Sequence, residues 1–319
     1  MILHDRPATR LATRLAFVVA GFGISCWAPL VPFAKERLAV DDGTLGLLLL
    51  CIGIGSVVAM QFTGALSARY GSKPAIVAGG LGLALILPLL SIAATPSTLA
   101  LTLLGFGAAL GSLDVAMNIH AVEVERAAGR PLMSGFHALF SVGGFAGSTL
   151  ITALLSWRLD PLASTLACSV IMLVAILFAW PRLLVGAQGE KGPLFVMPRG
   201  IVLLIAALAA VSFLVEGALL DWSALLVVNT GLVAATKGGV GYMLFAIAMT
   251  AGRLTGDAVT ARIGDRNTLL WGGILAGPAA IGFVSNAVGL RNAFWMLAAL
   301  LCLVPLTARF VVNGSSGKQ

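Results

Sequence analysis

Acidic side chains that interrupt long apolar runs are the residues of this sequence that could do chemistry. Glu216 is the clearest case, because Leu214, Val215 and Leu219 flank it in the chain. Placing a charged side chain at the centre of a membrane costs ~2.5 to 3.5 kcal/mol, so such a group is a functional candidate. A carboxyl in these surroundings holds a proton more readily than one in water. We expect Glu216 to bind and release protons; a carboxyl that only joins helices is the alternative interpretation.

Two polar pairs have helical spacing. Asp114 and Asn118 are four residues apart, as are His137 and Ser141, so each pair lies on one face if its run is helical. A histidine changes charge near neutral pH, and a neighbouring carboxylate can exchange protons with it. We therefore expect Asp114 and His137 to form a proton relay or an inner gate. The alternative is a hydrogen-bonded cluster that joins two glycine-rich segments.

Two tryptophans mark further candidates. Asp221 precedes Trp222, although a tryptophan beside a carboxylate is also ordinary at a membrane interface. Trp27 precedes Pro29 and Pro32, and proline frees backbone carbonyls inside a helix and lets it bend. We include Asp221 and Trp27 among the residues that could contact a solute.

The common patterns of catalytic and metal sites are missing from the sequence. Its four cysteines and three histidines are scattered singly, which predicts neither a disulfide framework nor a metal site. No nucleophile elbow or nucleotide-binding loop is recognisable. We therefore expect no cofactor and no enzyme activity. An intramembrane enzyme that uses Asp114 and His137 is a weaker alternative.

The elements that must position these residues are membrane helices. The 319 residues are 59% hydrophobic and 10% charged, whereas about a quarter of the residues of a soluble domain are charged. Uncharged runs long enough for spans of about 20 residues recur, and they lack the alternation of barrel strands. We predict an all-α polytopic membrane protein with ten helices, in runs that cover residues 15–34, 43–68, 74–113 (two helices), 131–157, 161–181, 200–228, 238–261, 268–285 and 292–312.

Basic residues predict the orientation of these helices. If the N-terminus is cytoplasmic, fifteen of the 20 Lys and Arg residues lie on the cytoplasmic side and five lie outside. This is the bias of the positive-inside rule, so we place both termini in the cytoplasm. The same bias accounts for the net charge of +7 without a nucleic-acid partner, since the basic residues do not cluster.

A short pattern occurs twice, 193 positions apart. Residues 65–74 read ALSARYGSKP and residues 258–267 read AVTARIGDRN, and both follow predicted spans that end on the cytoplasmic side. A repeat at equivalent turns of two halves is typical of one transporter architecture. The chain resembles the major facilitator superfamily, in which a motif of the form G-x-L-x-D-R-x-G-x-K/R links spans two and three.

The resemblance implies a cytoplasmic gate built from the two copies of this motif. Ala68 and Ala261 stand where the family usually has Asp, so we expect Arg253 and Asp257, four residues apart, to supply a local ion pair. A role as topology signals and turn formers is the alternative. The residues that we assign to the gate are Gly64, Arg69, Gly71, Lys73, Arg253, Asp257, Arg262, Gly264 and Arg266.

The family fold has twelve spans, two more than this sequence predicts. Residues 268–276 resemble the start of the family's ninth span, whereas residues 277–294 resemble the end of its eleventh span and the turn beyond. One helical hairpin is then missing at a junction near residues 276–278, through a natural deletion or a gene-model artefact. We expect a six-helix half (1–182), a cytoplasmic linker (183–199) and a shortened half of about four helices (200–319).

Residues 112–144 and 216–225 resemble a branch of bacterial inner-membrane members whose substrates are mostly unassigned. The resemblance implies a monomeric secondary active transporter that moves a small solute across the lipid bilayer by alternating access. The acidic residues described above suggest proton coupling, as in a symporter. The alternative is an internally deleted remnant that no longer transports.

Overall fold

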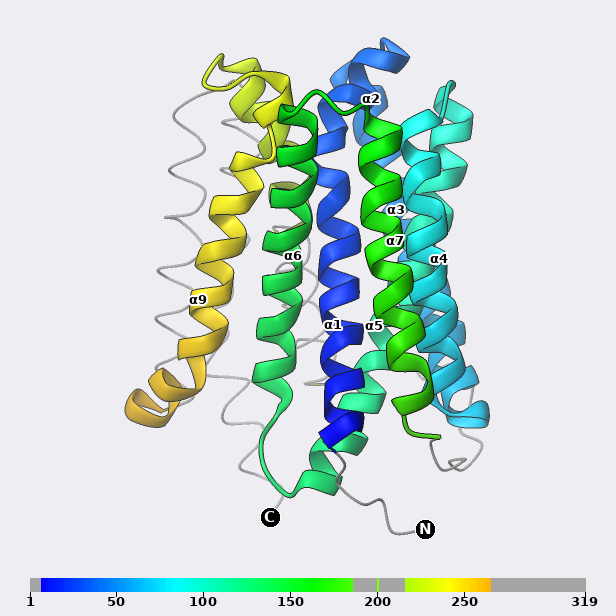
Figure 1. Cartoon of the computed structure of the whole chain (residues 1–319), viewed down its shortest axis with the longest axis vertical. Helices are drawn as coiled ribbons and strands as arrows, with labels where there is room; N and C mark the ends of the chain where they lie inside the picture. The colour runs from blue at the N-terminus through cyan, green and yellow to red at the C-terminus, as the bar shows by residue number, and fades with distance from the viewer. Residues whose placement is uncertain (1–6, 186–199, 201–215, 265–319) are drawn as a thin grey trace. The chain divides into compact units, whose positions relative to one another are not determined.

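The computed structural model describes residues 7–185, 200 and 216–264, and in these residues the protein is all-α (Figure 1). A helical segment also covers residues 216–229. The remaining elements, in chain order, are α1 (Pro7–Trp27), η1 (Ala28–Leu30), α2 (Val31–Leu38), α3 (Asp42–Tyr70), α4 (Ser72–Ile92), α5 (Pro96–Ala128), α6 (Met133–Ser156), α7 (Pro161–Ala179), η2 (Trp180–Arg182), η3 (Ala235–Lys237) and α9 (Val240–Ile263).

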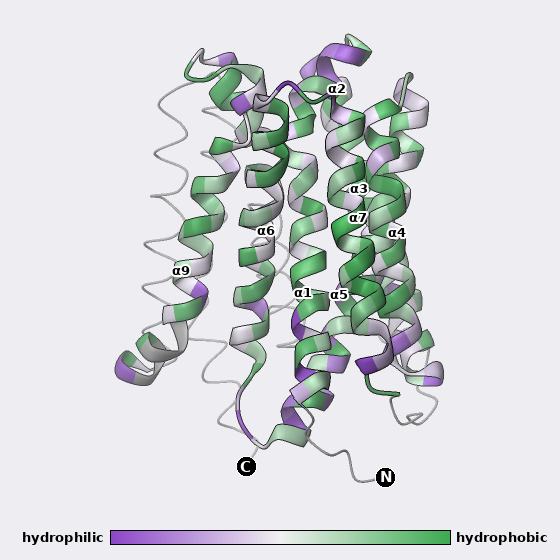
Figure 2. Ribbon diagram, viewed as in Figure 1, coloured by the Kyte–Doolittle hydropathy of each residue, from purple (hydrophilic) through white to green (hydrophobic). Residues whose placement is uncertain are grey.

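Six helices of the described part are long and apolar enough to cross a membrane, and they confirm the predicted runs between residues 15 and 181. Figure 2 shows that the middle turns of these helices are largely apolar and that polar residues gather towards their ends. The segment 216–229 and helix α9 overlap the predicted runs 200–228 and 238–261, and they end one and two residues beyond them. The two last predicted spans lie outside the described residues.

The chain divides into two compact units. The first contains residues 1–195 and 221–254, and the second contains residues 196–220 and 255–319. Of the second unit the structure describes residue 200, residues 216–220 and residues 255–264. The predicted division into two halves at the linker 183–199 stays a prediction.

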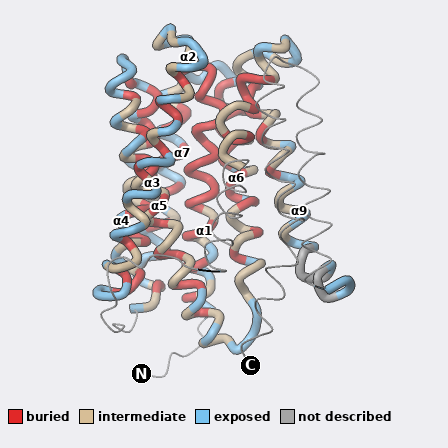
Figure 3. Tube along the Cα trace, turned by 180° about the vertical axis from the view of Figure 1, so that it is seen from behind, coloured by how far each residue is buried: buried red, intermediate tan, exposed pale blue. Residues whose placement is uncertain are grey.

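Helix α1 is the central helix of the first unit. It packs most extensively on α6 and also on α7, α5 and α4. Within an apolar stretch of 18 residues, 89% of the span that contains α1 is buried inside the protein, against 22% for α3. Figure 3 shows this contrast along the traces of the two helices. Helix α1 ends at Trp27, and the 3-10 turn η1 around Pro29 joins it to α2. Pro29 thus lies in a 3-10 turn that interrupts the α-helical hydrogen bonding of this span, and a bend there stays a prediction.

Glycines allow the helices of the first unit to touch through their backbones. A Cβ on Gly21 of α1 would overlap the carbonyl oxygen of Phe140 in α6, and a Cβ on Gly143 would overlap that of Val18. Gly55 of α3 and Gly107 of α5 make a second contact of the same kind, each facing a carbonyl of the other helix. Membrane helices associate through small residues because lipid offers no hydrophobic driving force between them.

Polar residues fix the helix ends. Asp41 caps α3 by accepting a hydrogen bond from the Thr44 backbone N–H at 2.7 Å, and this bond holds the pKa of the Asp41 carboxyl below its ordinary value. At the end of α4, the Arg37 guanidinium of α2 donates to the carbonyls of Leu90 at 2.8 Å and Ala93 at 2.9 Å, and also to that of Ser91. Arg37 thus binds carbonyls that lack helical partners and ties α2 to α4.

We predict that Gly107→Ala destabilises the protein by about 1 to 3 kcal/mol, the usual cost of overpacking. The added methyl group would collide with the Ile52 carbonyl and force α3 and α5 apart. Gly53→Ala is the matched control, because a Cβ on Gly53 of α3 meets no atom within 4 Å. The measurement is the free energy of unfolding in detergent, and equal stability of the two variants would contradict the packing account.

Candidate functional site

The candidate site is the seam where α9 lies against α1 and α6. Ser25 of α1 donates a hydrogen bond to the Tyr242 hydroxyl of α9 at 3.0 Å, and both residues are buried. Ser148 of α6 donates to the carbonyl oxygen of Gly239 at 3.3 Å. Small residues bring the elements together here, since a Cβ on Gly239 would overlap the Thr152 hydroxyl and lie 2.8 Å from a ring carbon of Pro29.

Arg253 of α9 is a charged residue that contacts α6 across the same seam. Its Nη1 donates to the Ser141 hydroxyl at 2.5 Å and lies 3.4 Å from the backbone carbonyl of His137. Its guanidinium also lies over the Phe140 ring, 5.7 Å from the centroid. Sequence analysis placed Arg253 in the gate but expected Asp257 as its partner. The Asp257 side chain lies outside the described residues, so that pair stays a prediction, whereas the contact with α6 was not foreseen.

The two predicted pairs lie on different helices, Asp114 with Asn118 on α5 and His137 with Ser141 on α6. The Asn118 amide of α5 donates to the Asp114 carbonyl at 2.9 Å and lies 3.3 Å from the Asp114 carboxylate. His137 of α6 lies edge-on to Phe17 of α1, with ring centroids 5.2 Å apart. Helix α5 packs mainly on α3 and α4, whereas α6 packs mainly on α1. A relay between Asp114 and His137 stays a prediction.

Two acidic candidates belong to the helical segment 216–229. Glu216 is half-buried. The Oδ1 atom of Asp221 is buried and accepts no hydrogen bond, and the Trp222 ring lies 3.7 Å from where a Cβ on Gly46 of α3 would stand. A buried carboxylate oxygen without a donor is costly in its charged form. Asp221 is therefore the acidic candidate for which the described residues show a buried carboxylate oxygen without a hydrogen-bond donor.

Trp27 is fully buried on α1, and its indole Nε1 has no hydrogen-bond partner. It lies one helical turn beyond Gly23, where a Cβ would approach the side chains of Met172 in α7 and Leu83 in α4. Residues four apart share a helix face, whereas Ser25 lies between them on the face towards α9. The structure thus shows Trp27 as a buried residue of α1, and its contact with a solute stays a prediction.

The glycines of the two motif copies both have a positive φ. Gly71 has φ of +81° directly after α3, and Gly264 has φ of +80° directly after α9. Residues with a Cβ rarely adopt this conformation, so glycine is required at both turns. Both motif copies thus place a glycine of positive φ directly after a helix.

The other motif residues show less specific surroundings. Arg69 is exposed and lies over the Tyr70 ring at 5.2 Å, Lys73 is half-buried, and Arg262 is exposed. A Cβ on Gly64 would meet no atom within 4 Å, so packing does not explain that glycine. Arg266 lies outside the described residues. The gating role of the motif stays a prediction.

His120 is a buried polar residue that sequence analysis set aside with the dispersed histidines. Its Nε2 accepts a hydrogen bond from the Leu184 N–H at 3.0 Å, so the proton of the neutral ring is on Nδ1, 3.1 Å from the Thr13 hydroxyl of α1. His120 thus joins α5, α1 and the chain just after α7. Helical spacing from Leu113 and Met117 could have placed His120 on a buried face.

Comparisons with known proteins decide the family. The family model described as Major Facilitator Superfamily matches residues 14–316, which is most of the chain. The chain belongs to the major facilitator superfamily. Proteins of this superfamily are transporters and not enzymes, so the intramembrane enzyme alternative is wrong. The fold class predicted from the sequence is confirmed.

Relatives in the superfamily cover nearly the whole chain. An uncharacterised MFS-type transporter from Yersinia pestis is 43% identical over an alignment of 368 positions, which covers 95% of this chain and 96% of the relative. An uncharacterised transporter from Sinorhizobium fredii is 34% identical and covers 78% of this chain and 67% of its own length. Crystal structures of the nucleoside transporter NupG share the fold, with a TM-score of 0.67 and 13% identity for the D323A mutant, over 97% of this chain and 82% of that one.

We predict that Arg253 and Ser141 are energetically coupled. A hydrogen bond to a charged group contributes about 1.5 to 3 kcal/mol, so the double variant Arg253→Gln with Ser141→Ala should cost less than the sum of the two single variants. The measurement is a double-mutant cycle on the free energy of unfolding in detergent.

Arg262→Gln combined with Ser141→Ala is the matched control for this cycle, because Arg262 is exposed near the end of α9. Its effects should add within about 0.3 to 0.5 kcal/mol. Additivity of the Arg253 pair would contradict the coupling.

Proposed function

We propose that this superfamily member is a proton-coupled secondary active transporter that moves a small solute across the bacterial inner membrane by alternating access. The observation that carries the proposal is the composition of the seam between α9 and the pair α1 and α6. Its described contacts are glycine approaches and a few side-chain hydrogen bonds, as at Ser25 with Tyr242 and at Ser148 with Gly239. Contacts of this kind can part and re-form.

The energies of these contacts suit a moving interface. A neutral hydrogen bond contributes about 0.5 to 1.5 kcal/mol net, so two such bonds and the Arg253 contact amount to a few kcal/mol. Differential binding of a solute to two states can shift an equilibrium by that amount. Contacts within the first unit differ, since α1 with α6 and α3 with α5 meet through backbone at several glycines. We infer that α1 to α7 move as one body relative to α9.

Acidic residues would carry the coupling proton. Glu216 and Asp221 lie on one helical segment, and Asp221 has a buried oxygen that accepts no hydrogen bond. Protonation would remove the charge of such a carboxyl while the seam is closed, and release would follow when water reaches it. In this proposal two further groups take part in proton transfer. They are Asp114, which is bonded to Asn118, and His137, which lies beside Arg253.

Orientation and gating follow from the charge distribution. With both termini in the cytoplasm, the turns at Gly71 and Gly264 lie on the cytoplasmic side, next to Arg69 and Arg262. In this proposal the two turns and Arg253 form the cytoplasmic gate, and the working unit is a monomer in the lipid bilayer.

A second candidate is a remnant that folds but no longer transports. The alignment with the Yersinia pestis relative has 368 positions, whereas the chain has 319 residues. The relative thus has residues at no fewer than 49 positions where this chain has none. A hairpin of two spans needs about 40 residues and a turn. This difference supports a missing hairpin, which we place near residues 276–278.

A ligand screen distinguishes the transporter from the remnant. We expect one class among sugars, organic acids, amino acids and hydrophobic drugs to stabilise the purified chain, by about 2.7 kcal/mol at 100 times the dissociation constant. Thermal unfolding at pH 5.5 and pH 7.5 measures the effect, and proton coupling predicts that it depends on pH. A polydisperse protein that melts early and responds to nothing would favour the remnant.

Replacing Glu216 tests the proton site. Glu216→Gln keeps the shape of the side chain but cannot bind the proton, so we expect solute uptake into proteoliposomes to lose its dependence on pH. Glu36→Gln is the control, because Glu36 is an exposed residue of α2. Uptake by the Glu216 variant with an unchanged pH profile would rule Glu216 out, and the same test with Asp221→Asn would then examine the second carboxyl.

A further inference from the structure

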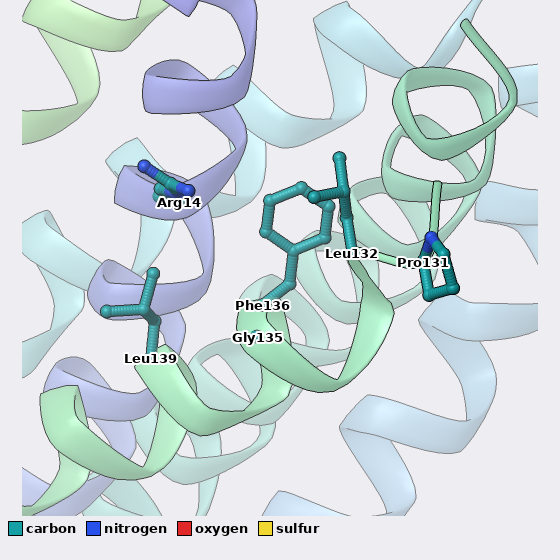
Figure 4. A pocket seen from close by; sticks show the side chains of 6 residues that line it. All are labelled: Arg14, Pro131, Leu132, Gly135, Phe136 and Leu139. Atoms are coloured by element: carbon teal, nitrogen blue, oxygen red, sulfur yellow. The ribbon is translucent and has the colours of Figure 1, made fainter. Parts of the chain in front are cut away.

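A cavity of about 410 Å³ opens between α1, the α5–α6 loop and the start of α6 (Figure 4). Arg14 projects into it from α1, and Leu132 and Phe136 lie on the facing wall. Pro131, Gly135 and Leu139 complete the lining. One cation thus stands at the side of a space whose remaining walls are apolar.

Arg14 is available for a ligand. It is exposed, and it is the last exposed residue of α1, since no residue between it and Glu36 of α2 is exposed. Within the described part of the chain it takes part in no hydrogen bond or ion pair. A cation without a partner beside an apolar cavity complements a ligand that has both an anionic group and an apolar body.

The opposite wall of the cavity is fixed before any ligand arrives. The Glu125 carboxylate accepts hydrogen bonds from the backbone N–H groups of Leu132 at 2.7 Å and Met133 at 2.8 Å. These bonds hold the loop in place and cap α6. They also engage the Glu125 carboxylate with backbone donors.

The position of the cavity indicates a lipid. Arg14 lies near the start of the apolar span Pro7–Leu38, and Leu11, one turn earlier on the same face, is 41% exposed. A cation next to an exposed apolar side chain at the start of a span is typical of the membrane interface. Basic pockets between membrane helices bind the headgroups of anionic lipids. Their acyl chains would match the apolar walls.

We propose that this cavity binds an anionic phospholipid, with the phosphate at Arg14 and the start of an acyl chain against Leu132, Phe136 and Leu139. The site is separate from the seam at α9 and does not depend on which solute is transported. Lipid bound there would bridge α1 and α6 at the end of the bundle where α1 begins.

The test is equilibrium binding of fluorescent phosphatidylglycerol to the full chain in detergent. We expect Arg14→Gln to weaken binding about five-fold, which corresponds to the ~1 kcal/mol that one basic residue contributes at an anionic lipid surface. Arg130→Gln is the matched control, because Arg130 is exposed in the same loop but does not line the cavity. It should leave binding within two-fold, on the order of the spread of surface substitutions.

A second variant tests the cavity by filling it. A Cβ on Gly135 would meet no atom within 4 Å, so Gly135→Leu should fold normally and yet occupy the space of the acyl chain. Gly53→Leu is the control, since Gly53 is equally open but lies on α3. We expect only the Gly135 variant to bind phosphatidylglycerol more weakly, at an unchanged unfolding temperature.

Three outcomes would overturn the proposal. Phosphatidylcholine binding as tightly as phosphatidylglycerol would remove the headgroup preference. Equal losses in Arg14→Gln and Arg130→Gln would show a diffuse surface charge. Full displacement of the lipid by inorganic phosphate or octanoate at equal concentration would identify a site for soluble anions. Losses confined to Arg14→Gln and Gly135→Leu, together with weak phosphatidylcholine binding, would support it.

Discussion

Backbone contact between helices is the constraint on which this structure depends. In lipid, apolar side chains gain no hydrophobic free energy by packing on another helix instead of on lipid chains. Close backbone approach and hydrogen bonds must therefore hold the helices together. Gly21 and Gly143 bring α1 onto α6, and Gly55 and Gly107 bring α3 onto α5. These contacts bury α1 at the centre of the first unit, which fixes the faces that remain for α9 and for ligands.

Polar side chains form hydrogen bonds that connect different elements of the first unit, and each such connection is called a joint here. Arg37 binds the last carbonyls of α4, Glu125 holds the start of α6, and His120 connects α5 with α1 and with the chain after α7. Each joint satisfies backbone or hydroxyl groups that would be costly to leave without partners in lipid. Such contacts connect helices of the first unit that lie far apart in the sequence, as Arg37 does for α2 and α4 and His120 does for α5 and α1.

The seam at α9 combines both kinds of contact with a charge. Ser25 and Ser148 supply neutral hydrogen bonds, whereas Arg253 reaches the Ser141 hydroxyl from α9. A hydrogen bond to a charged group contributes more than a neutral one, so we expect the Arg253 contact to be the strongest of these three.

The sequence by itself determined the six membrane helices between residues 7 and 182 and the glycines Gly71 and Gly264 that follow α3 and α9. These features depend on the lipid solvent and on neighbours within about one helical turn, so they can be deduced from spacing. Only the tertiary structure decided which candidates meet. It directed Arg253 to Ser141, 112 positions away, gave His120 two partners and placed Arg14 beside an apolar cavity. Such partners depend on which helix faces pack together, and contacts between distant residues leave no periodic signal in one sequence.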